Sequence, residues 1–192
     1  MLDGSGFYKE KFVKLSSSEE TFRNKEFEDC KFEYCSFTNC IFEKIKFINC
    51  TFNECSLSAV KLVDCRFLEV KFTKCRVIGI DWTRVPANGI RQLEFKDCQL
   101  NYSNFSYLKL REIKMTGCEI HEADFTETDL SDADLSGADL IKSRFYKTNL
   151  SGADLRGAKN YYIDVKNNAI AKARFSFPEV MTLLNSLDVI IE

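Results

Sequence analysis

Apolar residues recur at every fifth position along most of this chain. Counted in fives, all thirteen positions from Phe22 to Trp82 are apolar, and after a slip of three residues so are all thirteen from Phe95 to Leu155. In a chain that is 45% apolar, this regularity would arise by chance on the order of once in a billion, so it marks an internal repeat. We call these the central positions; they hold 13 of the 17 phenylalanines.

A second signal lies two residues before each central position, at what we call the inner small position. From Ala123 onward this position holds alanine, serine or threonine, and earlier in the chain it holds every cysteine. The three residues between one central position and the next inner small position are mostly polar. The nine cysteines are Cys30, Cys35, Cys40, Cys50, Cys55, Cys65, Cys75, Cys98 and Cys118.

A period of five fits neither an ordinary helix nor a flat strand. On an α-helix the central residues would point in all directions, and on a strand they would alternate between the two faces. A chain that turns after every repeat can instead keep both inner positions inside a coil of polygonal cross-section. Successive coils then stack as parallel strands, so the pattern predicts a β-solenoid.

The repeats resemble those of the pentapeptide-repeat family. Ala133-Asp134-Leu135 matches the alanine–aspartate–leucine form of that repeat, and Cys30-Lys31-Phe32 matches its cysteine–any–phenylalanine form. The resemblance implies an all-β fold, a right-handed quadrilateral β-helix with four repeats in each coil.

The repeat pattern divides the chain into three parts. We expect an N-terminal cap over residues 1–19, although Phe7 and Phe12 keep the five-residue spacing. The β-helix is expected over residues 20–158, with a register break and a loop at 83–92. Residues 159–192 are expected to form a C-terminal cap and dimerisation segment.

The C-terminal segment carries a helix signal. Ser176 and Glu179 have the spacing of a capping box, with Pro178 in the first turn, so we expect a short α-helix followed by a strand. Its apolar surface exceeds what a cap requires, which predicts a homodimer. The expected interface residues are Val180, Met181, Leu183, Leu184, Leu187, Val189, Ile190 and Ile191.

Nothing in the sequence indicates catalysis. The single histidine, His121, follows a central position, and no nucleophile–base arrangement or phosphate-binding loop is present. The cysteines never come closer than five residues apart, so we expect buried, reduced thiols rather than disulfides or a metal site. We therefore expect no enzyme, no cofactor, no metal and no small-molecule substrate.

The charge of the chain limits the classes of partner that we expect. Lys and Arg total 27 and Asp and Glu total 29, for a net charge of −2, so direct nucleic-acid binding is not expected. Residues 117–140 nevertheless contain eight acids and no Lys or Arg. These acids could form a DNA-like surface, or the aspartates could support the turns locally. With Asp154, which stacks over Asp134, we call this set the acidic collar: Glu119, Glu122, Asp124, Glu127, Asp129, Asp132, Asp134, Asp139 and Asp154.

The register break is the other candidate contact element. Turn-forming residues in this stretch predict a loop that stands off the rod, which is either a binding element or a tolerated bulge. The candidate contact residues in it are Arg84, Pro86, Asn88 and Arg91.

Within the family, the layout is similar to the quinolone-resistance and microcin-immunity branch. That resemblance implies a DNA-mimicking modulator of DNA gyrase or topoisomerase IV, both type II topoisomerases. The alternative is a scaffold or protein-interaction module with an unrelated partner. The apolar runs are too short for a membrane span, the N-terminus lacks a secretory signal, and the cysteines are typical of a reducing compartment, so we expect a cytoplasmic location.

Overall fold

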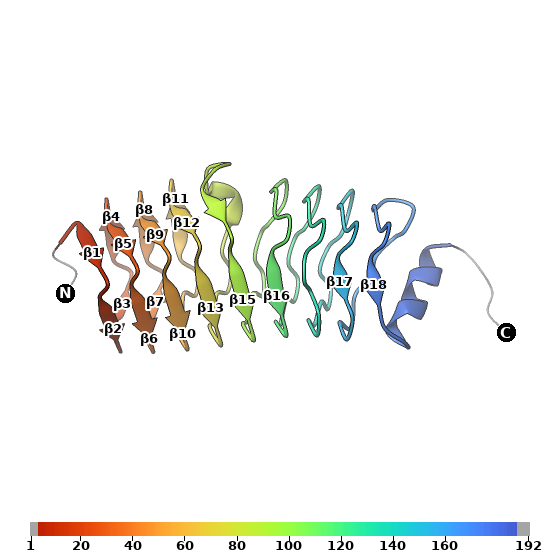
Figure 1. Cartoon of the computed structure of the whole chain (residues 1–192), viewed down its shortest axis with the longest axis horizontal. Helices are drawn as coiled ribbons and strands as arrows, with labels where there is room; N and C mark the ends of the chain where they lie inside the picture. Colours follow the sequence, from red (N-terminus) through yellow and green to blue (C-terminus); the bar gives the residue numbers. More distant parts are fainter. Residues whose placement is uncertain (1–3, 188–192) are drawn as a thin grey trace.

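A computed structural model, which describes residues 4–187, shows a rod of about eight stacked coils (Figure 1). The described strands pair in parallel, and strands twenty residues apart meet in register, so that Phe27 pairs with Phe47. Four flat faces run along the rod, and each coil contributes one repeat to each face. The expected fold class, a quadrilateral β-helix, is confirmed.

The first two faces carry the longest sheets. Face 1 consists of β1 (Gly6–Tyr8), β5 (Glu26–Glu28), β9 (Lys46–Ile48), β12 (Arg66–Leu68) and β14 (Ile90–Arg91). Face 2 consists of β2 (Lys11–Val13), β6 (Lys31–Glu33), β10 (Thr51–Asn53), β13 (Lys71–Thr73), β15 (Glu94–Lys96) and β16 (Lys114–Thr116), and it continues in β17 (Asp154–Leu155) and β18 (Arg174–Phe175).

The other two faces have fewer regular strands. Face 3 contains β3 (Ser16–Ser18) and β7 (Ser36–Thr38), and face 4 contains β4 (Thr21–Arg23), β8 (Ile41–Glu43) and β11 (Lys61–Val63). Two 3-10 helices complete the described chain, η1 (Trp82–Arg84) and η2 (Glu179–Ser186). In the later coils, single bridges such as Asp134 to Asp154 replace most strands.

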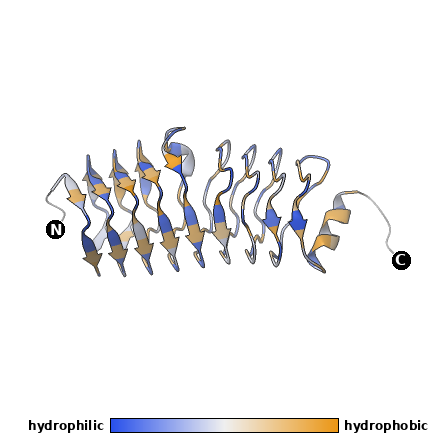
Figure 2. Ribbon diagram, viewed as in Figure 1, coloured by the Kyte–Doolittle hydropathy of each residue, from blue (hydrophilic) through white to orange (hydrophobic). Residues whose placement is uncertain are grey.

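The core is a column of stacked central side chains. Phe47 is 2% exposed, and its ring stacks on those of Phe27 and Phe67 at centroid distances of 5.2 and 5.4 Å. Trp82 stacks on Phe105 across the register break, at 5.9 Å. Figure 2 shows apolar residues along the middle of the strands, flanked by polar ones. The five-residue repeat therefore works as predicted, because each corner aims the next central residue inward.

Cysteines of the following coil hold the corners in the N-terminal half. At the corner after Phe32, the N–H of Cys35 donates to Sγ of Cys55 at 3.3 Å, and that thiol donates to the carbonyl of Phe32 at 3.4 Å. Cys75 repeats both contacts one coil later. One thiol thus serves the two backbone groups that a tight turn would otherwise pair with each other.

In the C-terminal half, most corners close on themselves. The N–H of Ala133 donates to the carbonyl of Leu130 and the N–H of Ala138 to that of Leu135, both at 3.1 Å. The next coil offers alanine above these corners, which has no atom to bridge the two groups. Gly137, at the third position of its corner, has φ +69°, as a type II turn requires.

Three expected boundaries are corrected by the structure. The described part of the expected N-terminal cap, residues 4–19, instead forms β1, β2 and β3, because Phe7 and Phe12 stack on the rings of Phe27 and Phe32 at 4.8 and 4.9 Å. At the other end, coils continue past residue 158 to β18. The register resumes at Ile90, which pairs with Phe67, one repeat earlier than the spacing predicted.

Gly89 explains why the register resumes there. A Cβ at this position would lie 2.6 Å from Val85 Cγ1 and 3.0 Å from the carbonyl oxygens of Cys65 and Pro86. Only glycine allows the loop to fold back so closely onto the coil beneath it. The Gly89 carbonyl then accepts from the N–H of Phe67 at 2.6 Å, which restarts the ladder.

The expected C-terminal helix is present as the 3-10 helix η2 rather than an α-helix. Ser176 does not cap it, because its hydroxyl accepts from the N–H of Gly157 at 3.0 Å, and the N-cap residue, Pro178, makes no side-chain hydrogen bond. Ser186 Oγ accepts from the N–H of Val165 at 3.2 Å and fixes the helix to the last coil.

Candidate functional site

The residues of the acidic collar follow one another around the rod. Four of the aspartates lie on the four different faces, and each bridges to the residue twenty positions later on its own face; they are Asp129, Asp134, Asp139 and Asp124. The spacing argument therefore placed them correctly, including the stacking of Asp154 over Asp134. The collar does not form one continuous face.

The aspartates of the collar are half-buried, except Asp132, which is exposed. Most of them accept a hydrogen bond from the backbone N–H two residues later, which fixes the carboxylate against its own turn. These contacts are the local turn support that the sequence left as an alternative. They join Asp124 to Thr126 at 2.8 Å, Asp129 to Ser131 at 3.1 Å, Asp134 to Ser136 at 3.0 Å and Asp154 to Arg156 at 3.0 Å.

Cations flank the collar in the neighbouring coils. On face 2, Asp134 and Asp154 lie in one column between Lys114 on one side and Arg174 on the other. On face 3, Lys159 Nζ lies 3.4 Å from Asp139, and at the corner beside face 4 Lys147 Nζ lies 3.7 Å from Glu127. The negative potential of the collar is therefore confined to a short length of the rod.

Hydrogen bonds and nearby cations lower the pKa of several collar carboxylates, as Asp154 and Asp139 show. Hydrogen bonds from the Arg156 side chain, 2.9 Å from Nε to Oδ1, lower the pKa of Asp154. For Asp139, burial opposes ionisation, but Asn160 Nδ2 at 2.8 Å, Lys159 and His121 lower its pKa overall. Both groups are engaged within the coil, which leaves the exposed glutamates Glu119, Glu122 and Glu127 as the freer acids of the collar.

The predicted contact loop is shorter than expected. Arg84 ends η1, and its Nε lies 3.4 Å from Asp81 Oδ2. Pro86 is half-buried and Asn88 is exposed. Arg91 does not belong to the loop: it lies in β14, and its Nη2 contacts Glu69 Oε1 at 2.8 Å. Placing Arg91 in the loop was wrong because the register resumes one repeat earlier.

The residues expected at a dimer interface divide into three groups. Leu183 is buried against the last coil, and Val180 and Leu184 are half-buried. Met181 and Leu187 are each 39% exposed, so they remain available to a partner. The other expected residues, Val189, Ile190 and Ile191, lie outside the described residues.

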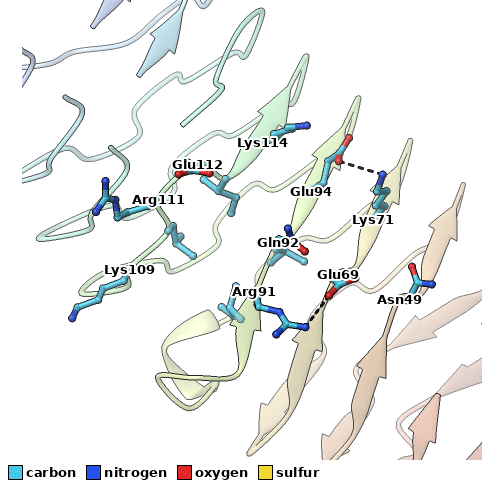
Figure 3. A pocket seen from close by; sticks show the side chains of 14 residues that line it. Asn49, Glu69, Lys71, Arg91, Gln92, Glu94, Lys109, Arg111, Glu112 and Lys114 are labelled. Carbon is cyan, nitrogen blue, oxygen red and sulfur yellow. Dashed lines mark hydrogen bonds and ion pairs between the residues drawn. The ribbon is translucent and has the colours of Figure 1, made fainter. Parts of the chain in front are cut away.

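A groove at the corner between faces 1 and 2 was missed by sequence reasoning. It has a volume of about 780 Å³, and both walls carry charged residues (Figure 3). Its apolar floor includes Leu93 and Ile113, which occupy inner small positions. These two bulky residues at consecutive levels of one corner, next to the three-residue slip, are the signal that could have located it.

Other site types were searched within the described chain. All nine cysteines are free and buried, and burial raises the pKa of the Cys50 thiol to about 12 and also raises that of Cys65. Within residues 4–187, no group of three or more His, Cys, Asp or Glu could hold a metal ion. Neither helix of this part of the chain has the length and apolar character to cross a membrane.

Two family models match the repeats. The model of the pentapeptide repeat region matches residues 25–105, and the model of eight pentapeptide repeats matches residues 118–157. The chain belongs to the pentapeptide-repeat family. Together the two matches span most of the coils described above, on both sides of the register break.

Solved structures of pentapeptide-repeat proteins have the same fold. Two trypsin-treated variants of QnrB1, a plasmid-mediated fluoroquinolone resistance protein, match with TM-scores of 0.75 and 0.76 at 17% and 18% identity. These matches cover 97% of this chain and 100% and 98% of the QnrB1 variants. Full-length QnrB1 matches with a TM-score of 0.58 at 18% identity, covering 96% of this chain and 100% of its own. A sequence search among curated proteins finds no significant match.

Proposed function

We propose that this pentapeptide-repeat protein is a non-enzymatic rod that binds other proteins through its outer surface. Stacked apolar side chains fill its interior, so the residues free to contact a partner are those at the outer positions of the repeats. The observation that carries the proposal is this division of every coil into a sealed core and a rigid, variable surface, which suits recognition by shape and charge. The nine free cysteines favour a reducing compartment, and we place the protein in the cytoplasm.

The first partner to test is a type II topoisomerase, either gyrase or topoisomerase IV. The likeness to QnrB1 along nearly the whole of both chains supports this choice, and the acidic collar supplies carboxylates for a basic nucleic-acid groove on such an enzyme. Binding in that groove as a DNA mimic would lower the sensitivity of the enzyme to quinolones or peptide toxins.

The second candidate is a scaffold whose partner is unrelated to topoisomerases. It is favoured by the cations that flank the collar, because Lys114 and Arg174 bound the acidic column of face 2 on both sides. A mimic of duplex DNA benefits from a longer uninterrupted acidic surface than this.

A supercoiling assay of gyrase with and without ciprofloxacin separates the two candidates. For the topoisomerase modulator, the wild-type protein should restore supercoiling in the presence of the drug, and replacing Glu119, Glu122 and Glu127 together by Gln should abolish the effect. These three glutamates are chosen because the aspartates support turns. A matched control replaces three exposed acids of earlier coils, Glu19, Glu28 and Glu54, by Gln and should behave as the wild type. If the wild-type protein has no effect on gyrase or topoisomerase IV, the partner is a different protein.

The proposed assembly is a homodimer through residues 176–192. The exposed Met181 and Leu187 support it, together with Phe177, which is 80% exposed. Light scattering should give twice the mass of one chain, and a variant with Leu184→Asp and Ile190→Asp should give the mass of one. A wild-type monomer at micromolar concentration would contradict the dimer.

A further inference from the structure

The ladder of face 1 is interrupted in the middle of the rod. Below the interruption, the N–H groups of Phe67 and Glu69 donate to the carbonyls of Gly89 and Arg91 at 2.6 and 2.8 Å. Above it, the N–H of Leu110 donates to the backbone carbonyl of Asp129 at 2.8 Å. Within the described chain, no backbone hydrogen bond joins residues 90–92 to residues 109–111, and β14 is the last strand of its sheet.

The cause of the interruption lies at the corner beside it. Leu93 and Ile113 are stacked there at inner small positions, above Val70, whereas most other coils have cysteine or alanine at this corner. The Ile113 side chain cannot bridge the corner from Ile90 to Leu93 as Cys55 bridges the corner after Phe32. The corner from Leu110 to Ile113 instead closes on itself, because the N–H of Ile113 donates to the carbonyl of Leu110 at 3.2 Å. The neighbouring faces remain paired, as Glu94 and Lys114 show on face 2. At the level of this gap, face 4 is also paired, through Asp81 and Asn104.

The gap opens into the groove of about 780 Å³ described above. Ile90, Leu93, Leu110 and Ile113 contribute to its lining, and three of them are buried core residues. In Figure 3, Lys109 and Arg111 lie on one side and Arg91 and Gln92 on the other. The groove thus combines an apolar floor with a strand edge whose hydrogen-bonding groups are not used by the rod.

The two walls differ in charge. On the wall formed by β14 and its neighbours, Arg91 is paired with Glu69 at 2.8 Å and Lys71 with Glu94 at 3.8 Å. The opposite wall, residues 109–114, has three cations and one acid. Within the described chain, its Lys109 and Lys114 form no ion pair. The groove therefore presents uncompensated positive charge on a chain whose net charge is −2.

We propose that this groove binds an extended acidic segment of a partner protein, which adds to the free edge of β14. The backbone of the segment would pair with the unpaired groups of Ile90 and Gln92. Alternate side chains would point into the apolar floor, and the others would place carboxylates beside Lys109 and Lys114. This surface is distinct from the acidic collar and does not depend on topoisomerase binding.

An acidic protein segment fits the groove better than a nucleic acid does. A nucleic-acid backbone carries phosphates but cannot continue the β-ladder, and it would leave the N–H groups of β14 in a narrow cleft without regular partners. An acidic strand can pair its backbone with the edge of β14 and also place carboxylates beside the cations. The alternation of apolar and acidic residues is the sequence pattern that such a segment requires.

The experiment uses a fluorescent heptapeptide of alternating glutamate and valine, blocked at both ends, and the full-length protein. Fluorescence anisotropy at low ionic strength should show saturable binding at micromolar concentrations. The same peptide with N-methyl groups on alternate residues, which cannot pair as a strand, should not bind. In NMR hydrogen-exchange measurements, the amides of Ile90 and Gln92 should become protected when the unmodified peptide is added.

Charge-reversal variants provide the second arm. Replacing Lys109 and Lys114 by Glu should weaken binding of the acidic peptide by about tenfold or more and should create binding of a lysine–valine peptide. The matched control, Lys31→Glu with Lys44→Glu, reverses two exposed lysines away from the groove and should change affinity less than about twofold. Both variants keep the core, so equal thermal melting would show that they fold.

Several outcomes would overturn the proposal. One is no binding of the glutamate–valine peptide to the wild-type protein. Another is equal binding of the N-methylated peptide, or equal weakening by the control variant, since both would indicate non-specific charge attraction. Displacement of the peptide by a twelve-nucleotide oligothymidylate that itself protects no β14 amide would assign the groove to nucleic acid instead.

Discussion

The coils before the register break and those after it reach the same cross-section by different means. The earlier coils stack phenylalanines in their core and use cysteine thiols to bridge their corners, as at Phe32 and Cys55. The later coils contain more leucine and alanine, and corners such as Leu130 to Ala133 close through their own backbone. The difference shows that the residue at the inner small position selects how a corner is held, while the five-residue spacing sets the shape.

The same comparison explains where binding surfaces arise. A corner whose inner position has a thiol, a hydroxyl or a methyl group closes tightly, by one route or the other. Within the described chain, the corner from Ile90 to Leu93, which has Ile113 in the next coil, shows neither contact, and the ladder opens beside it. The interaction surfaces proposed above thus follow from departures from the repeat rather than from the repeat itself.

The largest expected effect is on the stacked phenylalanines. Phe47→Ala should lower the free energy of unfolding by about 3–5 kcal/mol, because it removes a buried ring and two stacking contacts. Leu135→Ala, at a central position of the later coils, should cost somewhat less, about 2–4 kcal/mol. Chemical denaturation monitored by circular dichroism measures both, and a loss below about 1 kcal/mol for Phe47→Ala would contradict the stacked core.

The corner contacts should give the next largest effect. Cys55→Ala leaves the Phe32 carbonyl and the Cys35 N–H unpaired, so it should lower the free energy of unfolding by about 1–3 kcal/mol. Cys55→Ser keeps a bridging group and should recover part of that loss. Thr148→Ala should cost only about 1 kcal/mol, because the Phe125 carbonyl that Thr148 contacts also accepts from Thr128 at 3.1 Å. Equal costs for the two alanine variants in denaturant titrations would show that the two halves do not differ in this way.

Corner glycines should give a smaller effect. Gly137 has φ +69°, so Gly137→Ala should cost about 1–2 kcal/mol. Gly137→Asn should cost less, because asparagine tolerates this conformation and already occupies it at Asn24 in an early coil. Thermal melting of the two variants measures the difference, and identical shifts would indicate that the backbone of this corner is not constrained.

The smallest expected effect is a dependence on acid in the later coils. Arg156 lowers the pKa of Asp154 in the folded protein, so the stabilisation is complete above the unfolded value of about 3.9 and is lost as the pH falls through the lower folded value. Asp154→Asn and Arg156→Gln should each make the free energy of unfolding depend less on pH in the acidic range. An NMR titration of Asp154 that gives an ordinary pKa would contradict this assignment.

Much of the fold followed from the spacing of the residues, and the errors have physical causes. The central positions and the buried cysteines are set by periodicity alone, and the stacking of Asp134 with Asp154 also needs the four repeats per coil that the family resemblance implies. The N-terminal boundary was misplaced because Glu20 and Lys25, at inner small positions, indicated an imperfect first coil. In the structure Glu20 is exposed, and Lys25 Nζ donates to the carbonyl of Gly4 at 2.7 Å. The helix signal was correct in position, but Ser176 is used by Gly157 and not as a cap.

By itself, the sequence determined the solenoid and which side chains point into it, because a strict period fixes direction in a coil, and the resemblance to the pentapeptide-repeat family implied the four faces. Only the tertiary structure decided how each corner is held and where the ladder fails, because those depend on pairs of residues from consecutive coils. Leu93 and Ile113 are each ordinary apolar residues in the sequence. The ladder opens beside them only in the folded rod, where one lies above the other, twenty residues away in the chain and one coil away in space.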